Sequence, residues 1–204
     1  VTDDVKLAAK VGADAVVIDS MVAGTGASAE VLLDHSGIPT VPAIVLAREA
    51  LRELGLSEEV SLIASGGIRS GADVAKAMAL GADAVAIGLA ALIALNCNKD
   101  IPEADYAKEV GVNAGYCHHC HTGKCPVGIT TQDPELMKRL DPDEAAQRVA
   151  NFLNAMTMEL SLLTRSLGKG DVHSLEPEDL AALTIEASVM ARVPLVGTDK
   201  VFGT

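Results

Sequence analysis

The chain has 204 residues, which is enough for one ordinary domain with a substantial core. It is 49% hydrophobic but only 2% aromatic, a composition typical of a parallel α/β sheet covered by helices. A formal net charge of -12 excludes a surface built to neutralise nucleic-acid phosphates or to face an anionic membrane.

The longest apolar stretch, Ala84–Leu95, falls well short of the roughly 20 residues that a spanning helix needs. No export signal is evident, so we expect a cytoplasmic protein whose cysteines stay reduced and available to a metal. The sequence opens at Val1 in the middle of a helical pattern. We therefore expect a fragment, or one piece of a split protein.

One structural unit occurs twice in the first half of the chain. A short helix at Val5–Lys10 ends at Gly12 and leads to a buried strand at Ala15–Ile18. The same order returns at 74–87, and the pentapeptide Gly-Ala-Asp-Ala-Val begins both at Gly12 and at Gly81. A repeat of helix, turn and buried strand predicts stacked βα units.

Further helices and strands alternate up to residue 87. Helices are predicted at Ala43–Leu54 and Val74–Leu80, and strands at Val60–Ala64 and Ala84–Ile87. Their connections suit right-handed crossovers in a parallel sheet, so the fold class is α/β. Three strands do not close a barrel, and a (β/α)8 barrel would need five more.

The second half of the chain is mainly helical. Asn98–Asn113 is polar and predicts a surface insertion. A long helix is predicted at Asp141–Leu167, capped by Asp141 or Asp143, with Gly168 at its end. Another helix is predicted from Ser174 to Leu183, and the last residues are expected to form a loose tail.

Glycine-rich turns follow the second and third strands, where each gives way to a helix. Such glycines let backbone N–H groups approach an anion, and the helix start adds a favourable dipole. In (β/α)8 barrels the loops after the last two strands commonly bind phosphate. We predict a phosphate-bearing cofactor, with a tight turn as the alternative for the double glycine. The candidate residues are Ser65, Gly66, Gly67, Ile68, Arg69, Gly88, Leu89 and Ala90.

A third glycine-rich segment follows the first strand and should lie at the same edge of the sheet. Its glycines and hydroxyls suit close contact with a carboxylate or a flavin ring. A flexible glycine-rich connection is an equally good interpretation. The residues are Gly24, Thr25, Gly26, Ala27 and Ser28.

The four cysteines all lie between residues 97 and 125, three of them in one short loop. The spacing Cys-x2-Cys-x4-Cys-Pro gathers thiolates, as an iron–sulfur cluster or a zinc ion requires. A zinc ion would take three thiolates with His119 or His121, whereas the proline after the last cysteine favours iron–sulfur. The candidate metal ligands are Cys97, Cys117, Cys120 and Cys125.

Several stretches that contain these glycines and cysteines resemble, in the expected order, the FMN-binding synthase domain of glutamate synthase. The likeness covers residues 1 to 170, and the cysteine block is its most specific part. The matching stretches are Gly24–Ser28, Ser65–Gly71, Ala90–Cys97, Cys120–Gly128, Thr131–Leu136 and Arg148–Phe152.

The resemblance implies a (β/α)8 TIM barrel of which only the sixth to eighth strands are present. Residues 1–96 would then be the C-terminal part of an FMN-binding TIM barrel. Residues 97–133 would be a cysteine-rich iron–sulfur loop with an insertion, and residues 134–204 a helical C-terminal extension. In the family, the cluster lies beside the flavin.

The resemblance also implies a chemistry. FMN would be bound with its phosphate at Gly66, Gly67 and Gly88, together with a 3Fe-4S or 4Fe-4S cluster. Family members form 2-iminoglutarate from 2-oxoglutarate and ammonia, which is supplied as such or derived from glutamine. A hydride from reduced FMN then gives L-glutamate. The electrons come from ferredoxin or from an NAD(P)H-oxidising subunit.

The resemblance leaves the cluster type open and assigns no catalytic residue. Cys97, Cys120 and Cys125 match a three-cysteine, three-iron pattern, to which Cys117 would add a fourth ligand. Alternative functions are a related N-methylglutamate synthase subunit and a non-catalytic, truncated metal-binding fragment. The segment Ser65–Gly88 also resembles inosine monophosphate dehydrogenase. That enzyme needs a nucleophilic cysteine between the first two strands, and the sequence has none there.

Overall fold

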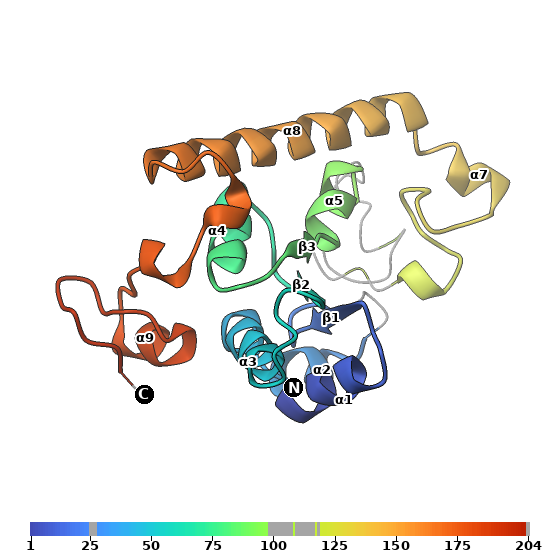
Figure 1. Ribbon diagram of the computed structural model, residues 1–204. Helices are drawn as coiled ribbons and strands as arrows, with labels where there is room; N and C mark the ends of the chain where they lie inside the picture. The colour runs from blue at the N-terminus through green and yellow to red at the C-terminus, as the bar shows by residue number, and fades with distance from the viewer. Residues whose placement is uncertain (25–27, 98–107, 109–116, 118, 203–204) are drawn as a thin grey trace.

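A parallel sheet of three strands lies at the centre of the computed structural model, which describes residues 1–24, 28–97, 108, 117 and 119–202. The strands are β1 (Ala15–Asp19), β2 (Ser61–Ser65) and β3 (Ala84–Ala86), side by side in sequence order (Figure 1). Asp19 is level with Ser65, and Ser65 with Ala86. The predicted strands are confirmed, and their carboxyl ends meet at one edge of the sheet.

Helices cover one face of this sheet. They are α1 (Thr2–Lys10), α3 (Thr40–Glu53) and α4 (Gly71–Ala79). Leu62 and Ala64 of β2 point into the core beneath them and are 0% exposed. Alternate residues on the opposite face are open, and Val17 of β1 is 56% exposed. A parallel sheet is normally covered on both faces, so this one presents a surface for further packing.

The two copies of the Gly-Ala-Asp turn have the same backbone geometry. Gly12 after α1 and Gly81 after α4 have φ angles of 94° and 111°, which favour glycine. In each copy the residue after the glycine donates its N–H back into the last helical turn, from Ala13 to Ala8 and from Ala82 to Ala77. The predicted repeat therefore exists as a repeated helix end.

A buried arginine ties the second copy of this turn to its neighbours. Arg48 of α3 donates to the carbonyl oxygens of Gly81 (2.7 Å) and Ser57 (2.8 Å). Its remaining nitrogen pairs with the Asp83 carboxylate at 2.8 Å. The other carboxylate oxygen of Asp83 accepts the N–H of Leu62 at 2.7 Å. The buried charge is thus paired and hydrogen-bonded, as burial requires.

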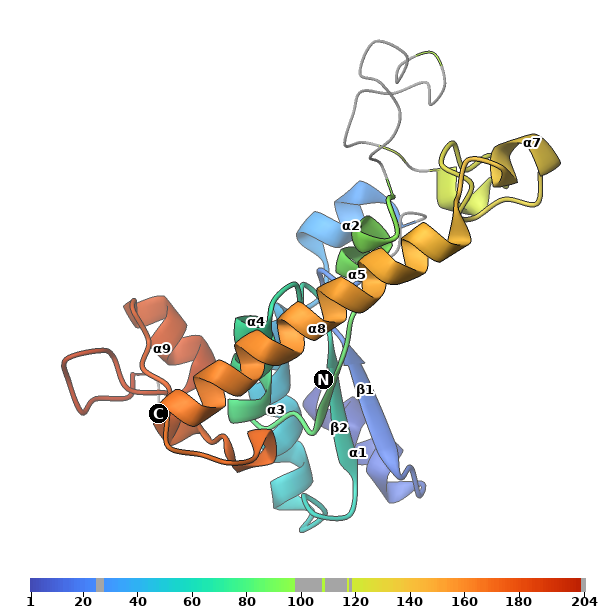
Figure 2. The ribbon, with the colours of Figure 1, turned by 90° about the horizontal axis from the view of Figure 1, so that it is seen from above.

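The longest helix, α8 (Pro142–Ser166), lies across α4 and across the short helix α5 (Leu89–Ala94), as Figure 2 shows. Asp141 caps it by accepting the N–H groups of Asp143 and Glu144 at 3.0 and 3.1 Å. Gly168 follows the end of α8 with a φ of 75°. The helix predicted at 141–167 and its caps are confirmed.

The contact between α4 and α8 depends on a small residue. A Cβ atom added to Gly71 would overlap the carbonyl oxygen of Met156 and lie 2.6 Å from the amide nitrogen of Leu160. The two helices therefore approach as closely as their backbones allow at this point. A larger side chain at Gly71 would push α8 away from α4.

The prediction of a helix from Ser174 to Leu183 is wrong. Short 3-10 turns, η2 (Val172–Ser174) and η3 (Pro177–Asp179), occupy its first half. Ala182 is extended because its N–H donates to Pro194 and its carbonyl accepts from Val196, beside a parallel bridge to Leu195. The expected loose tail is also wrong in part, because α9 (Ile185–Ala191) follows and packs on α3.

Short elements without a predicted counterpart complete the chain. They are α2 (Glu30–His35), α7 (Pro134–Met137) and the 3-10 turn η1 (His119–His121). The predicted insertion at Asn98–Asn113 lies outside the described residues, apart from Lys108. Among the helices that the structure describes, none combines the length and the hydropathy that a bilayer crossing requires.

Candidate cofactor and metal site

Hydroxyl groups fix the loop that follows β2. Ser20, just after β1, donates its hydroxyl hydrogen to the carbonyl oxygen of Ser65 at 3.0 Å. Thr40, at the start of α3, donates to the carbonyl oxygen of Gly66 at 2.9 Å. The two hydroxyl oxygens lie 2.6 Å apart. The ends of β1 and β2 and the start of α3 therefore hold one another in place.

Gly66 and Gly67 adopt a conformation that other residues avoid. Their φ angles are 117° and 71°, and a Cβ atom on Gly66 would overlap the Ser20 hydroxyl. Within the part of the chain that the structure describes, no hydrogen bond occupies the N–H groups of Gly67 and Ile68. These two groups are available to an anion, as the sequence predicted for this loop.

The N–H groups around the first turn of α4 already donate hydrogen bonds to nearby side chains. One oxygen of Asp73 accepts the N–H groups of Arg69 and Ser70, at 3.1 and 3.2 Å. The Ser70 hydroxyl accepts the N–H of Asp73 at 3.2 Å. Glu159 of α8 accepts the N–H of Gly71 at 2.6 Å. Two carboxylates thus offset the positive end of the α4 dipole, and the Arg69 amide is already hydrogen-bonded.

The first turn of α5 differs. No side chain among the described residues caps it, and its first amides, including those of Leu89 and Ala90, lack intrahelical acceptors. A Cβ atom built on Gly88 meets no described atom within 4 Å. Uncapped N–H groups beside open space make the start of α5 a better place for a phosphate than the start of α4.

The third glycine-rich segment begins against the same loop. Ideal Cβ positions on Gly66 and Gly67 lie 3.2 Å from the Ala23 side chain and 3.1 Å from the Val22 side chain. Gly24 is exposed and Ser28 is half-buried. The other predicted residues of this segment, at 25–27, lie outside the described residues. The described start of this segment therefore adjoins the Gly66–Gly67 loop.

The cysteines gather beyond the far end of α5. Cys97 follows this helix of six residues, which is about 9 Å long. Burial raises the pKa of the Cys97 thiol, and the charges of Cys120, Cys125 and Cys117 raise it further. Burial likewise raises the pKa of Cys120, followed by the effects of Cys117 and Cys125. Cys97 and Cys120 therefore lie close enough to the other cysteines for like charges to disfavour their thiolates.

Cys125 has the opposite shift. Burial alone would raise the pKa of its thiol, but backbone N–H groups of Thr130, Val127 and Ile129 and the Thr130 hydroxyl lower it overall. These donors stabilise a sulfur that carries negative charge. Hydrogen bonds to the sulfurs are also a feature of cysteine-bound iron–sulfur clusters, whose potentials they tune. The donor set around Cys125 therefore fits a cluster ligand.

His119 and His121, the described histidines of the cysteine loop, differ in exposure. His119 is half-buried and His121 is exposed. Within the described residues, no three Cys, His, Asp or Glu side chains are arranged to share a single metal ion. The structure thus brings the four cysteines into one neighbourhood without assembling the shell of a single ion.

Ser20, Thr40 and Glu159 are site residues that the sequence reasoning missed. Nothing near them in sequence distinguishes the two hydroxyls or the carboxylate. The spacing Ser70-x-x-Asp73 is different, because a serine followed three residues later by an acid suggests a reciprocal helix cap. That pattern could have indicated that the first amides of α4 donate hydrogen bonds to side chains of the helix itself.

Comparison with known proteins identifies the family of this chain. A protein-family model described as a conserved region in glutamate synthase matches residues 1–101 and 105–170. The chain belongs to the glutamate synthase family. The resemblance predicted from the glycine and cysteine motifs is therefore confirmed at the level of the family.

Individual family members extend this finding. The chain is 56% identical over 195 residues to a glutamate synthase large subunit-like protein of Rhizobium meliloti, covering 96% of this chain and 44% of that protein. It is 50% identical over 163 residues to the archaeal glutamate synthase [NADPH] of Methanocaldococcus jannaschii, covering 80% and 29%. The chain thus spans less than half the length of these relatives.

Proposed function

We propose that this chain carries the cofactor-binding part of a glutamate synthase, which reduces 2-iminoglutarate formed from 2-oxoglutarate and ammonia to L-glutamate. One observation carries the proposal. Uncapped backbone N–H groups at the start of α5 stand about one short helix away from Cys97, whose thiol feels the charges of the other three cysteines. A phosphate-bearing flavin and a cysteine-bound cluster would fit at the two ends of α5.

The fold that we propose is a (β/α)8 barrel, of which the described strands form three. Neighbouring strands follow the sequence order, and α1, α3 and α4 pack on one face. Such an arrangement favours closure into a barrel over a sheet with helices on both faces. In this proposal residues 1–96 belong to the barrel, 97–133 to the iron–sulfur loop and 134–204 to a helical extension.

The residues present fit an FMN phosphate. The N–H groups of Gly67 and Ile68 and those at the start of α5 would hold it, with Gly88 leaving room. Asp73 and Glu159 would keep the anion away from the start of α4. When bound, reduced FMN supplies the hydride for 2-iminoglutarate, and the cluster supplies the electrons that reduce the flavin. The segment Gly24–Ser28 would contact the substrate.

The cysteines fit a 3Fe-4S or 4Fe-4S cluster. Cys97, Cys120 and Cys125 would be ligands in either case, and Cys117 in the second. Thiolate ligands require a reducing compartment, which supports a cytoplasmic location. The electrons would come from a ferredoxin or an NAD(P)H-oxidising subunit. The name of the Methanocaldococcus relative, which includes NADPH, supports a nicotinamide source.

A graft tests the function in a complete protein. The segment of the Methanocaldococcus protein that matches this chain is replaced by the residues of this chain, and the product is called the graft below. Purified anaerobically, the graft should contain FMN and iron, and should form glutamate from 2-oxoglutarate, ammonia and a chemical reductant. Methylamine is the matched second amine. Glutamate formation below one hundredth of the parent rate, or a preference for methylamine, would contradict the proposal.

A cysteine variant tests the cluster separately. In the graft, Cys120→Ser should abolish iron binding and leave FMN bound, because the flavin contacts lie at the other end of α5. Iron content and flavin absorbance measure the two outcomes independently. Ser161→Ala, a change on α8 outside the site, is the control. Unchanged iron in the Cys120 variant would remove this residue from the ligand set.

A further inference from the structure

The peptide that joins Gly66 to Gly67 has its two ends in different surroundings. Gly66 is buried, and its carbonyl oxygen accepts the Thr40 hydroxyl hydrogen at 2.9 Å. Gly67, which supplies the N–H of the same peptide, is exposed. In a planar trans peptide the N–H points opposite to the C=O. The Gly67 N–H therefore points away from Thr40.

Glycine on both sides leaves the orientation of this peptide free. Turning the peptide plane over changes only the ψ angle of Gly66 and the φ angle of Gly67. Glycine populates positive and negative φ about equally, so its own sterics do not choose between the two orientations. Among the described residues, no backbone N–H donates to the Gly66 carbonyl oxygen. The hydrogen bond from Thr40 therefore selects the orientation that the structure shows.

The Thr40 hydroxyl is in turn oriented by Ser20. Two hydroxyl groups carry two hydrogens, whereas three oxygen contacts around them lie within hydrogen-bond distance. The Thr40 hydrogen goes to Gly66, so the 2.6 Å contact between the hydroxyls needs the Ser20 hydrogen. Ser20 shares that hydrogen between Thr40 and the Ser65 carbonyl oxygen, as in other three-centre bonds. The hydroxyls thus form a relay from Ser20 through Thr40 to Gly66.

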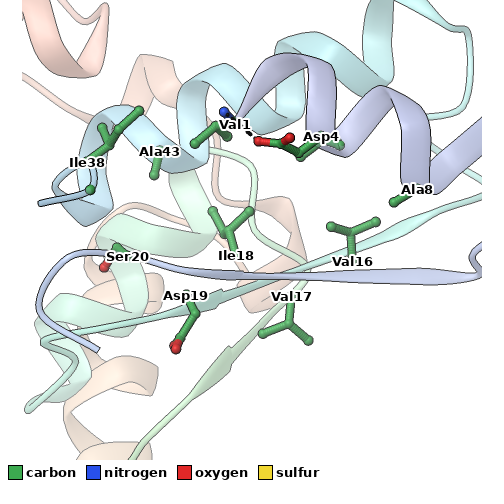
Figure 3. Close-up of a pocket in the computed structure, with 12 residues that line it drawn as sticks. Val1, Asp4, Ala8, Val16, Val17, Ile18, Asp19, Ser20, Ile38 and Ala43 are labelled. Atoms are coloured by element: carbon green, nitrogen blue, oxygen red, sulfur yellow. Dashed lines mark ion pairs between the residues drawn. The ribbon is translucent and has the colours of Figure 1, made fainter. Parts of the chain in front are cut away.

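The first member of this relay is firmly placed. Ser20 is 9% exposed, and its N–H donates to the Ser65 carbonyl oxygen at 3.1 Å. A Cβ atom on Gly66 would lie 2.0 Å from the Ser20 hydroxyl oxygen, so this hydroxyl fills the space that a side chain would take. In Figure 3, Ser20 lies at the end of β1 and lines a hollow together with Ile38 and Ala43.

We propose that Thr40, oriented by Ser20, is a positioning residue that keeps the Gly67 N–H aimed at the phosphate of the flavin. The proposal rests on the proposed function and adds the residues that set its phosphate affinity. Both hydroxyls act through the peptide, from the side of its carbonyl group. The bond that the Gly66 oxygen accepts also polarises the peptide, which makes the Gly67 N–H a stronger donor.

A purely structural tie between β1, β2 and α3 is the competing interpretation. Loss of such a tie would weaken the binding of FMN and of riboflavin alike, because the two flavins share the ring system and differ in the phosphate. Loss of a positioning residue would weaken FMN binding alone. The ratio of the two dissociation constants therefore separates the two interpretations.

Three variants of the graft measure this ratio. Thr40→Val removes the hydroxyl at nearly constant shape and should weaken FMN binding about tenfold or more, but riboflavin binding less than about twofold. Thr40→Ser restores the hydroxyl and should bind FMN within about threefold of the unchanged graft. Thr157→Val is the control, since its hydroxyl donates to the carbonyl oxygen of Leu153 at 2.9 Å on α8. Unchanged FMN affinity in Thr40→Val, equal losses for both flavins, or no rescue by Thr40→Ser would overturn the proposal.

Ser20→Ala is a milder test that leaves Thr40 and Gly66 in place. It should weaken FMN binding about threefold, because Thr40 loses the group that orients it. Added to Thr40→Val, it should cause no further loss, since both hydroxyls act on one peptide. Losses that multiply in the double variant would overturn the relay.

Crystal structures of the flavin-free graft show the peptide directly. The Gly66–Gly67 peptide should have one orientation in the graft and in Thr157→Val, and a reversed or mixed orientation in Thr40→Val. The original orientation alone in Thr40→Val would overturn the proposal, even where the graft binds FMN. A graft that binds no FMN would instead contradict the proposed function, and the peptide orientation would still test the relay.

Discussion

The starts of α4 and α5 are alike in sequence position but opposite in chemistry. Each helix follows a strand through glycines at the same edge of the sheet. At α4, Asp73, Ser70 and Glu159 occupy the N–H groups around the first turn. At α5, no side chain of the described residues does so. A helix start attracts an anion only where its own chain leaves the amides uncapped.

This difference also separates two uses of glycine. Gly66 is required by the fold, since its φ is 117° and any Cβ atom would overlap Ser20. Gly88 has open space beside it and a φ of −108°, which other residues adopt. The space around Gly88 thus gives the fold no steric reason for glycine, whereas a ligand that approaches the backbone would supply one.

The largest expected effect on stability distinguishes Gly66 from Gly88. In the graft, Gly66→Ala should lower the free energy of unfolding by about 2 to 4 kcal/mol, from a strained φ and an overlap with Ser20. Gly88→Ala should leave stability within about 0.5 kcal/mol. Chemical denaturation measures both. A large destabilisation by Gly88→Ala would mean that this glycine serves the fold.

Removing the Glu159 carboxylate, which α8 places at the start of α4, should have a moderate effect on stability. Glu159→Ala should destabilise the graft by about 1 to 2 kcal/mol, because the Gly71 N–H loses a charged acceptor at a partly exposed site. Glu159→Gln keeps an acceptor oxygen and should cost less. Thermal unfolding compares the two variants, and equal losses would mean that packing rather than the hydrogen bond is responsible.

The Glu159→Gln variant also tests where the phosphate binds. FMN affinity of the Glu159→Gln graft should rise about threefold at most, since only a distant negative charge is removed. Titration of the apoprotein measures this change. A rise above tenfold would place the anion at the start of α4 and reverse the comparison.

A smaller loss of stability is expected from the local cap of α4. Ser70→Ala should destabilise the graft by about 1 kcal/mol, and Ser70→Gly by only a few tenths, as at other helix N-caps. Neither change should alter FMN affinity measurably. Chemical denaturation and flavin titration are the two measurements, and a clear loss of FMN affinity would give α4 a direct part in binding.

Much of the sheet could be predicted from sequence because its signs are local. Apolar runs such as Ala15–Ile18 and the repeated Gly-Ala-Asp turn identify strands and their order. The helix predicted at Ser174–Leu183 failed because Ala182 takes its hydrogen bonds from Pro194 and Val196. Such a tertiary pairing overrides helix propensity and leaves no local pattern.

The residue types of the candidate site could be predicted from the sequence. Which of the two helix starts leaves its N–H groups uncapped could not. Glycines and cysteines at suitable spacing indicated a phosphate and a cluster. The choice between the two helix starts depends on Glu159, which lies 88 positions from Gly71 in sequence. The repeated Gly-Ala-Asp turn was visible in the sequence, but the partners that Arg48 and Leu62 provide to Asp83 were not.

The most direct test of the account compares FMN with riboflavin, which lacks the phosphate. Both are titrated into the anaerobic apoprotein of the graft, and flavin fluorescence gives the dissociation constants. Several backbone N–H groups aimed at one phosphate should make FMN bind at least about 100-fold more tightly. Affinities within threefold of each other would contradict the claim that the uncapped start of α5 and the Gly66–Gly67 loop hold a phosphate.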